Sequence, residues 1–216
     1  METSELLLAM YGDHVSSVPR YLWESEEDRW IELLACLLYR VSGLTMSSTR
    51  QLILIWRQFE LTKPSTLKEL EPGGDAHRLI SFSLAQSGMA ADQIDSSIAM
   101  LQSAARAVDS AYGGKIQVLL RKHAEATRDE LATVLENSGL SCQSLKVAIT
   151  NWLQNTTNAP LTLEDESVLR FCEHQGIGPK ELESIADHLN LNLALMDDVI
   201  ALDDASKPLL GKGEAP

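Results

Sequence analysis

The sequence predicts an all-α protein. Apolar residues recur at intervals of three and four through most of the 216 residues, capping residues and Gly or Pro mark the ends of these stretches, and no segment alternates convincingly with period two. Because a helix buries one stripe of its surface, this spacing favours packed helices without a sheet.

Composition favours a globular cytoplasmic protein. Hydrophobic residues make up 44% of the chain and charged residues 23%, which are ordinary values. The longest apolar stretch, residues 33–39, is far too short to span a bilayer, and an N-terminus with Glu2 and Glu5 but no early Lys or Arg is unlike a signal peptide. Three distant cysteines without metal-ligand spacing are expected to be reduced thiols: Cys36, Cys142 and Cys172.

The formal net charge of −13 is unevenly distributed. Residues 161–216 carry 12 acidic and 4 basic residues, whereas residues 1–160 carry 19 and 14. This balance repels polyanions, so nucleic-acid binding requires a local basic face. Candidates for that face are Lys115, Arg121, Lys122, Arg128 and Lys146. The acidic C-terminal segment is expected to be a solvated surface and a candidate contact for a protein partner.

The first half of the chain predicts five helices. Ser25 can cap the first, whose inner face recurs from Trp30 to Val41 and which Gly43 ends. The second carries an apolar stripe of Leu52, Ile55, Trp56 and Phe59 and ends at the Lys63-Pro64-Ser65 break. Next come a short helix after Ser65, a turn at residues 71–74 and a helix over 75–85. The fifth helix is long, carries apolar residues from Ile94 to Val108, and ends at Gly113-Gly114.

The second half predicts shorter helices with well-marked starts. Residues 127–130 resemble a capping box before Leu131, and Gly139 stops that helix. Ser141 can cap the next helix, and residues 158–160 break it. The inner face of this helix is expected to hold Leu145, Ala148, Ile149 and Trp152.

Two further helix starts follow. Residues 162–165 resemble another capping box, which opens a helix with Val168, Leu169 and Cys172 inside. Gly178-Pro179 starts one more helix, since Pro suits the first helical position. Residues 206–216 are expected to be a disordered tail.

Four segments in order resemble the helix-hairpin-helix DNA glycosylases, the superfamily that includes endonuclease III. They are an apolar first helix (31–38), a Gly before a long helix (85–89), a hairpin (135–145), and a loop leading to an acid, Asp165 (163–170). The resemblance covers roughly residues 24–178. It implies a two-lobed glycosylase-like fold in one domain, residues 1–205, with lobes of about 24–125 and 126–178 and completing helices over 179–205.

The resemblance also implies site residues. The hairpin turn would offer backbone N–H groups and a helix N-terminus to a DNA phosphate. Asp165 would be the catalytic carboxylate that stabilises positive charge on the sugar or activates the attacking group. Tyr39 and Arg40 would line the pocket. The hairpin residues expected at the phosphate are Gly139, Leu140, Ser141, Gln143 and Ser144.

This chain departs from the family pattern at several positions. Gln143 stands where lyase members carry the Lys that forms a Schiff base, and Ser141 replaces the second hairpin Gly. Tyr39-Arg40-Val41 replaces a polar Gln-Asn signature, and no cluster of four cysteines follows Asp165, so we expect no iron–sulfur centre. The five histidines are scattered without a metal pattern, and we expect no other metal or cofactor. The implied function is base-excision repair by a monofunctional N-glycosylase (a hydrolase) that acts on double-stranded DNA with a damaged base. No membrane is expected among its partners.

Several alternatives stay open at this point. Residues 175–180 also resemble a hairpin turn, with Lys180 and Asp198 at plausible family spacing, although this registration leaves little chain for the remaining helices. Asp165 serves equally well as a helix cap without catalysis. The eroded motifs and the net charge of −13 favour a degenerate family member that binds DNA structure or protein. A third option is an unrelated helical interaction protein.

Overall fold

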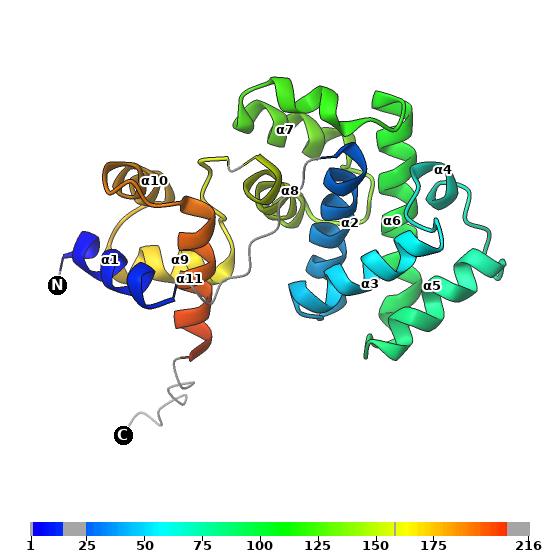
Figure 1. Cartoon of the computed structure of the whole chain (residues 1–216), viewed down its shortest axis with the longest axis horizontal. Coiled ribbons are helices and arrows are strands. Elements are labelled where there is room, and N and C mark those ends of the chain that lie inside the picture. Colours follow the sequence, from blue (N-terminus) through cyan, green and yellow to red (C-terminus); the bar gives the residue numbers. More distant parts are fainter. Residues whose placement is uncertain (1, 15–24, 158, 207–216) are drawn as a thin grey trace. The chain divides into compact units, whose positions relative to one another are not determined.

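The computed structural model describes residues 2–14, 25–157 and 159–206 (Figure 1). These residues form helices joined by turns and loops, with no strand in the described ranges, so the predicted all-α class is confirmed. Within the same ranges, no helix is both long enough and apolar enough to cross a membrane.

Contacts divide the chain into two units. The central unit is formed by Leu22–Thr157, and the terminal unit combines Met1–Tyr21 with Asn158–Pro216. That residues 1–205 act as one glycosylase-like domain stays a prediction. Each unit is described below by itself.

The central unit is built around α2 (Glu26–Ser42), which packs against α3 (Met46–Gln58), α6 (Ala91–Tyr112) and α8 (Cys142–Thr157). As predicted, Ser25 caps α2: its Oγ accepts the backbone N–H of Asp28 at 3.0 Å. Gly43 ends the helix with a left-handed φ of 65°. The buried stretch of α2 runs from Trp30 to Leu38, so this helix supplies the middle of the core.

The predicted inner face of α3 was partly wrong. Ile55 is 51% exposed and Phe59 63% exposed, whereas Leu52, Ile53 and Trp56 are buried. A periodic stripe marks one face of a helix but not how far that face is covered, and α3 buries the side that contacts α2.

The remaining helices of the central unit follow the predicted order. They are α4 (Pro64–Leu67), α5 (Asp75–Gln86), α6, the 3-10 helix η2 (Ile116–Arg121), which was not predicted, α7 (Ala124–Val134) and α8. Gly113 ends α6 in the left-handed region with a φ of 60°. The predicted capping box at 127–130 was wrong, because Thr127 lies inside α7, is buried, and donates its hydroxyl to the Leu119 carbonyl at 2.9 Å.

The terminal unit combines α1 (Thr3–His14) with α9 (Glu166–Gln175), α10 (Pro179–His188) and α11 (Leu193–Ser206). Helix α1 was not predicted. Pro179 begins α10 as expected. These helices share one apolar core, formed by Leu7, Met10, Val168, Phe171, Cys172, Leu182, Leu195, Met196, Val199 and Ile200.

Two predictions for the terminal unit need correction. Thr162 does not cap α9, because Asp165 itself is the N-cap residue, and Leu169 is 41% exposed while Val168 and Cys172 are buried. Of the predicted tail, Ser206 is the last residue of α11, and residues 207–216 lie outside the described residues, as does Asn158 of the predicted break at 158–160.

Candidate functional site

The predicted hairpin is a turn between two packed helices of the central unit. Helix α7 ends at Val134, α8 begins at Cys142, and the two helices pack against each other. Buried side chains hold both arms: Leu131 and Leu135 on one side, Leu145 and Ile149 on the other. The expected inner face of α8 is confirmed, since Ala148 and Trp152 are buried with them.

Gly139 gives this turn its shape. Its φ of +91° lies in the left-handed region, and a Cβ built there would meet no atom within 4 Å. The requirement for glycine therefore comes from the backbone conformation and not from crowding. The space above the turn is open, so a ligand can approach the backbone closely.

Ser141 caps α8, as the sequence predicted. Its Oγ accepts the backbone N–H of Ser144 at 3.1 Å and lies 2.9 Å from the Ser144 Oγ. The cap consequently uses the Ser144 N–H, which the family resemblance had assigned to phosphate. No described residue accepts the backbone N–H groups of Gly139, Leu140 or Ser141, which leaves three donors at the turn.

Two hydrogen bonds hold the turn in place, one from α6 and one within the turn. The Ser103 hydroxyl of α6 donates to the Asn137 carbonyl at 3.0 Å, and the backbone N–H of Ser138 donates to the Leu135 carbonyl at 2.9 Å. The Ser138 side chain is buried, and no described residue hydrogen-bonds to its hydroxyl. A turn fixed in this way presents its open N–H groups without first having to become ordered.

Ion pairs neutralise part of the expected basic face. Lys122 pairs with Glu130, and Arg128 pairs with Asp129 at 3.2 Å. The Lys122 ammonium lowers the pKa of the Glu130 carboxyl. Lys115 and Arg121 are exposed, with no ion pair to any described residue. The local cationic charge is therefore weaker than the count of basic residues indicates.

Tyr39 and Arg40, the expected pocket residues, lie in the last turn of α2 in the central unit. Tyr39 is half-buried and Arg40 is exposed. No described residue forms an ion pair with Arg40, and the hydrogen bonds of the described chain do not join either side chain to the hairpin.

Asp165 belongs to the terminal unit and is half-buried at the start of α9. Its Oδ1 accepts the backbone N–H of Val168 at 3.0 Å, the bond of an N-cap. No described residue hydrogen-bonds to Oδ2. A carboxylate has about four lone-pair sites, so capping occupies one oxygen and leaves the other able to face a ligand.

The loop before Asp165 is anchored by two acids that the sequence did not single out. The buried Asp197 of α11 accepts the Leu163 backbone N–H at 2.7 Å, and Glu183 of α10 accepts that of Thr162 at 2.9 Å. Leu161 and Leu163 are buried beside them. These contacts fix the chain two residues before Asp165. Long sequence separations of 34 and 21 residues hide such pairings from local pattern analysis.

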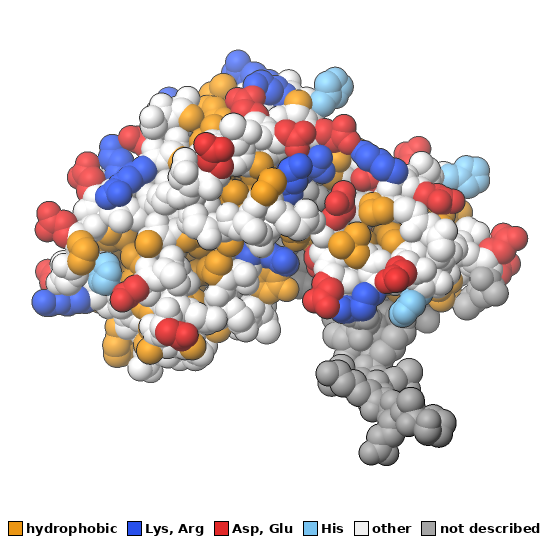
Figure 2. Space-filling view, turned by 180° about the vertical axis from the view of Figure 1, so that it is seen from behind, with side chains coloured by type: hydrophobic (Ala, Val, Ile, Leu, Met, Phe, Trp, Pro, Cys, Tyr) orange, Lys and Arg blue, Asp and Glu red, His pale blue; other side chains and the backbone are white. Residues whose placement is uncertain are grey.

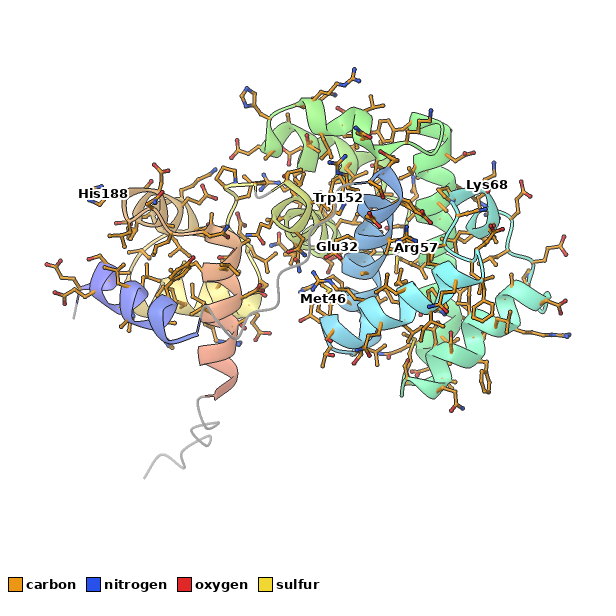
Figure 3. All side chains as sticks on the ribbon, in the orientation of Figure 1. Glu32, Met46, Arg57, Lys68, Trp152 and His188 are labelled. Atoms are coloured by element: carbon orange, nitrogen blue, oxygen red, sulfur yellow. The ribbon has the colours of Figure 1, made fainter. Side chains whose placement is uncertain are left out.

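A buried polar network in the central unit was also missed. Glu32 of α2, labelled in Figure 3, is 0% exposed, and it accepts hydrogen bonds from Arg50 of α3 and from Asn155 of α8, the latter at 2.7 Å. Cys36 donates to the same carboxylate at 3.7 Å. Burial, together with the nearby Glu32 charge, raises the pKa of the Cys36 thiol well above its usual value, so this thiol stays protonated.

The rival hairpin also exists as a turn, between α9 and α10 of the terminal unit. Gly176 ends α9 with a left-handed φ of 68°, and Gly178 precedes α10. Its Lys180 pairs with Glu183 at 3.3 Å, and Asp198 is exposed on α11. Among the described residues, no group of three or more His, Cys, Asp or Glu side chains is placed to hold a metal ion.

One solved structure places this arrangement among known folds. It is a trapped covalent intermediate of endonuclease III with DNA, an estranged-adenine complex. It matches 93% of this chain and 85% of that chain, with a TM-score of 0.56 and 13% sequence identity. At this identity the likeness shows the fold alone: the chain has the all-helical fold of endonuclease III. No protein-family model and no curated protein matches the sequence.

Proposed function

We propose that this chain is a DNA-glycosylase-like protein that binds duplex DNA through the turn between α7 and α8. The observation that carries the proposal is the geometry at Gly139: a left-handed residue with open space above it, followed by Leu140, Ser141 and an exposed helix start. Backbone N–H groups and the positive end of a helix dipole favour an anion, and a DNA phosphate has that charge and size.

Charge limits the strength of this binding. The central unit carries 16 acidic and 13 basic residues, whereas the terminal unit carries 15 and 5. Few phosphates are therefore neutralised by Lys or Arg, and long-range attraction is weak. We expect measurable affinity at low salt and a small dependence on salt compared with strongly basic DNA-binding proteins.

We further propose that Asp165 is the carboxylate of a monofunctional N-glycosylase acting on a damaged base. In this reaction water adds to the sugar C1′ as the glycosidic bond breaks, the base leaves with a proton, and an abasic site remains. The second oxygen of Asp165 would stabilise the positive charge that develops on the sugar, or would accept a proton from the attacking water. Gln143 carries an amide and no amine, so a Schiff base at this position is not expected.

Single-turnover release of base from lesion-containing duplexes tests this proposal. Asp165→Asn is the informative variant, because Asn caps a helix about as well as Asp and the fold should therefore be preserved. We expect base release by the wild-type protein, loss of release in Asp165→Asn, and unchanged duplex binding. Borohydride should trap no covalent complex with either protein. Equal release by both proteins would remove Asp165 from the mechanism.

A second candidate function is a non-catalytic family member that binds DNA structure or protein. The charge around Asp165 favours it: Glu164 and Glu166 flank the carboxylate and are exposed, and acidic side chains are spread over the face of the terminal unit seen in Figure 2. This surface would suit a basic protein partner. Duplex binding by the wild-type protein without base release from any lesion tested would favour this candidate over the enzyme.

A further inference from the structure

Leu163 is held at three points, two residues before Asp165. Its side chain is buried, its backbone N–H donates to Oδ2 of Asp197 at 2.7 Å, and its carbonyl accepts the backbone N–H of Asp165 at 2.7 Å. The second of these bonds spans two residues, as in a γ-turn, so the backbone at Asp165 follows from the conformation of Leu163. Oδ1 of Asp165 in turn accepts the backbone N–H of Val168 at 3.0 Å. A chain of hydrogen bonds therefore runs from Asp197 through Leu163 to the Asp165 carboxylate.

Asp197 is a buried acid in an otherwise apolar core. It lies on α11 and is 1% exposed, and its neighbours Met196 and Val199 belong to the apolar core of the terminal unit. Helices α11 and α9 pack against each other (Figure 1), and burial, followed by the charge of Asp197, raises the pKa of the Cys172 thiol on α9. A carboxylate in such surroundings costs stability unless hydrogen bonds offset the cost. The bond from the Leu163 N–H is such a contact.

Burial makes the contact between Asp197 and Leu163 hard to replace. Leu161 and Thr162 are buried alongside Leu163, so water does not readily reach this N–H. A hydrogen bond to an ionised carboxylate is also about twice as strong as one between neutral groups. If the carboxylate is removed, the N–H must lose its bond, or the loop must move until the N–H finds another acceptor. Either change alters the conformation of Leu163 and, through it, the position of Asp165.

We propose that Asp197 is a positioning residue for the carboxylate of Asp165. This inference rests on the proposed catalytic role of Asp165 and adds a requirement to it. At 1% exposure Asp197 can touch neither DNA nor a base, so it acts only through Leu163 and the Asp165 backbone. Displacing a catalytic group by about 1 Å can lower a rate by about 100-fold, so a contact that acts at this remove still affects the reaction.

Asp197→Leu in the full-length chain tests this assignment, because Leu has the branching of Asp but cannot accept the Leu163 N–H. We expect its single-turnover release of base to fall by about 10- to 100-fold, with unchanged duplex binding. Asp197→Asn keeps an oxygen that can accept this N–H, so its rate should stay within about threefold of the wild-type rate. Asp198→Leu is the matched control: Asp198 is the next residue of α11 and is exposed, and its substitution should leave the rate unchanged.

Amide hydrogen exchange measured by NMR detects the positioning without any chemistry. In Asp197→Leu, the backbone N–H groups of Asp165 and Val168 should exchange about fivefold faster or more, because each depends on the conformation of Leu163. The N–H of Cys172, further along α9, should keep its protection, since the core of the terminal unit stays folded. If circular dichroism shows that Asp197→Leu does not fold, Asp197→Ala provides the same comparison.

The two measurements separate this inference from the proposed function. A wild-type protein that releases no base contradicts the catalytic role of Asp165, and hydrogen exchange then decides the positioning role of Asp197 by itself. Unchanged exchange at Asp165 and Val168 in Asp197→Leu overturns the inference. So does release of base by Asp197→Leu at the rate of an active wild-type protein, or release by Asp197→Asn that is as slow as that of Asp197→Leu.

Discussion

Arg50 forms an ion pair with the buried carboxylate of Glu32 through two nitrogens: Nη2 lies 2.5 Å from Oε1, and Nε lies 3.0 Å from Oε2. The pair joins α3 to α2, and Asn155 of α8 donates a hydrogen bond to the same carboxylate. Removing one member of a buried pair leaves the other charge buried without a partner, which is destabilising. Replacing both with apolar groups also removes the cost of taking the two charges out of water.

Glu32→Leu should therefore lower the free energy of unfolding by about 3–5 kcal/mol, and adding Arg50→Met should restore most of it. Urea denaturation followed by tryptophan fluorescence measures both effects. Glu27→Gln provides the control, because its ion pair with Arg57 is half-exposed and should contribute about 1 kcal/mol or less. If the double variant is as unstable as Glu32→Leu alone, the unpaired charge of Arg50 is not the cause of the lost unfolding free energy.

Asp165→Ala should destabilise the terminal unit by about 1 kcal/mol, because the N–H of Val168 loses its cap. Asp165→Asn should change the unfolding free energy by only a few tenths of a kcal/mol, since Asn is a comparable cap. Thermal denaturation of the two variants makes the comparison. If Asn costs as much as Ala, the charge of Asp165 matters to the fold, and its catalytic test must be reinterpreted.

Gly139→Ala should destabilise the hairpin by about 1 kcal/mol, because a φ of +91° strains a residue with a Cβ. Duplex DNA binding should weaken by roughly fivefold if the turn contacts phosphate, because a shifted turn loses about one hydrogen bond to that phosphate, of about 1 kcal/mol.

The rival turn supplies the matched control for Gly139. Gly178 has an ordinary φ of −97°, and a Cβ there meets no atom within 4 Å. Gly178→Ala should leave DNA binding unchanged by fluorescence anisotropy, and it should lower stability only through the N-cap of α10, where Ala is a poorer residue than Gly. Weaker DNA binding in Gly178→Ala alone would favour the registration that uses residues 175–180.

Tyr112 should make the central unit less stable in alkaline solution. Burial, followed by the charge of Glu130 and the hydrogen bond to it at 3.3 Å, raises the pKa of Tyr112 to about 12 from its usual 10.0. Folding therefore favours the protonated phenol, and this stabilisation is complete below pH 10 and is lost as the pH rises toward about 12. Urea denaturation across this range should show a steeper loss for the wild-type protein than for Tyr112→Phe. Equal slopes would refute the coupling.

Local rules predicted the elements of this fold where the signal is local. Ser25, Gly43 and Gly113 mark helix ends through their own backbone conformations, and Ser141 caps α8 through a contact three residues away. The rules failed where burial depends on distant neighbours. Ile55 and Phe59 follow the helical period of α3, yet no other described helix covers them. Thr127 resembles a cap, but its hydroxyl donates to the Leu119 carbonyl of η2.

The candidate site was predicted less completely than the fold. The family resemblance proposed the hairpin and Asp165 as site residues, and these roles stay predictions; it did not indicate that the Ser141 cap uses the Ser144 N–H. The acids that fix the loop before Asp165, Asp197 and Glu183, lie on other helices. Both belong to the acidic C-terminal segment of the sequence, and the neighbouring residues do not indicate which acidic side chains of that segment are buried.

Binding of a duplex that contains an abasic site, measured by fluorescence anisotropy at low salt, tests whether this chain binds DNA through the turn between α7 and α8. We expect saturable binding by the wild-type chain, and we expect it to weaken as salt is added, because phosphate contacts release counterions. Absence of binding at low salt, with a protein shown by circular dichroism to be helical, would contradict it.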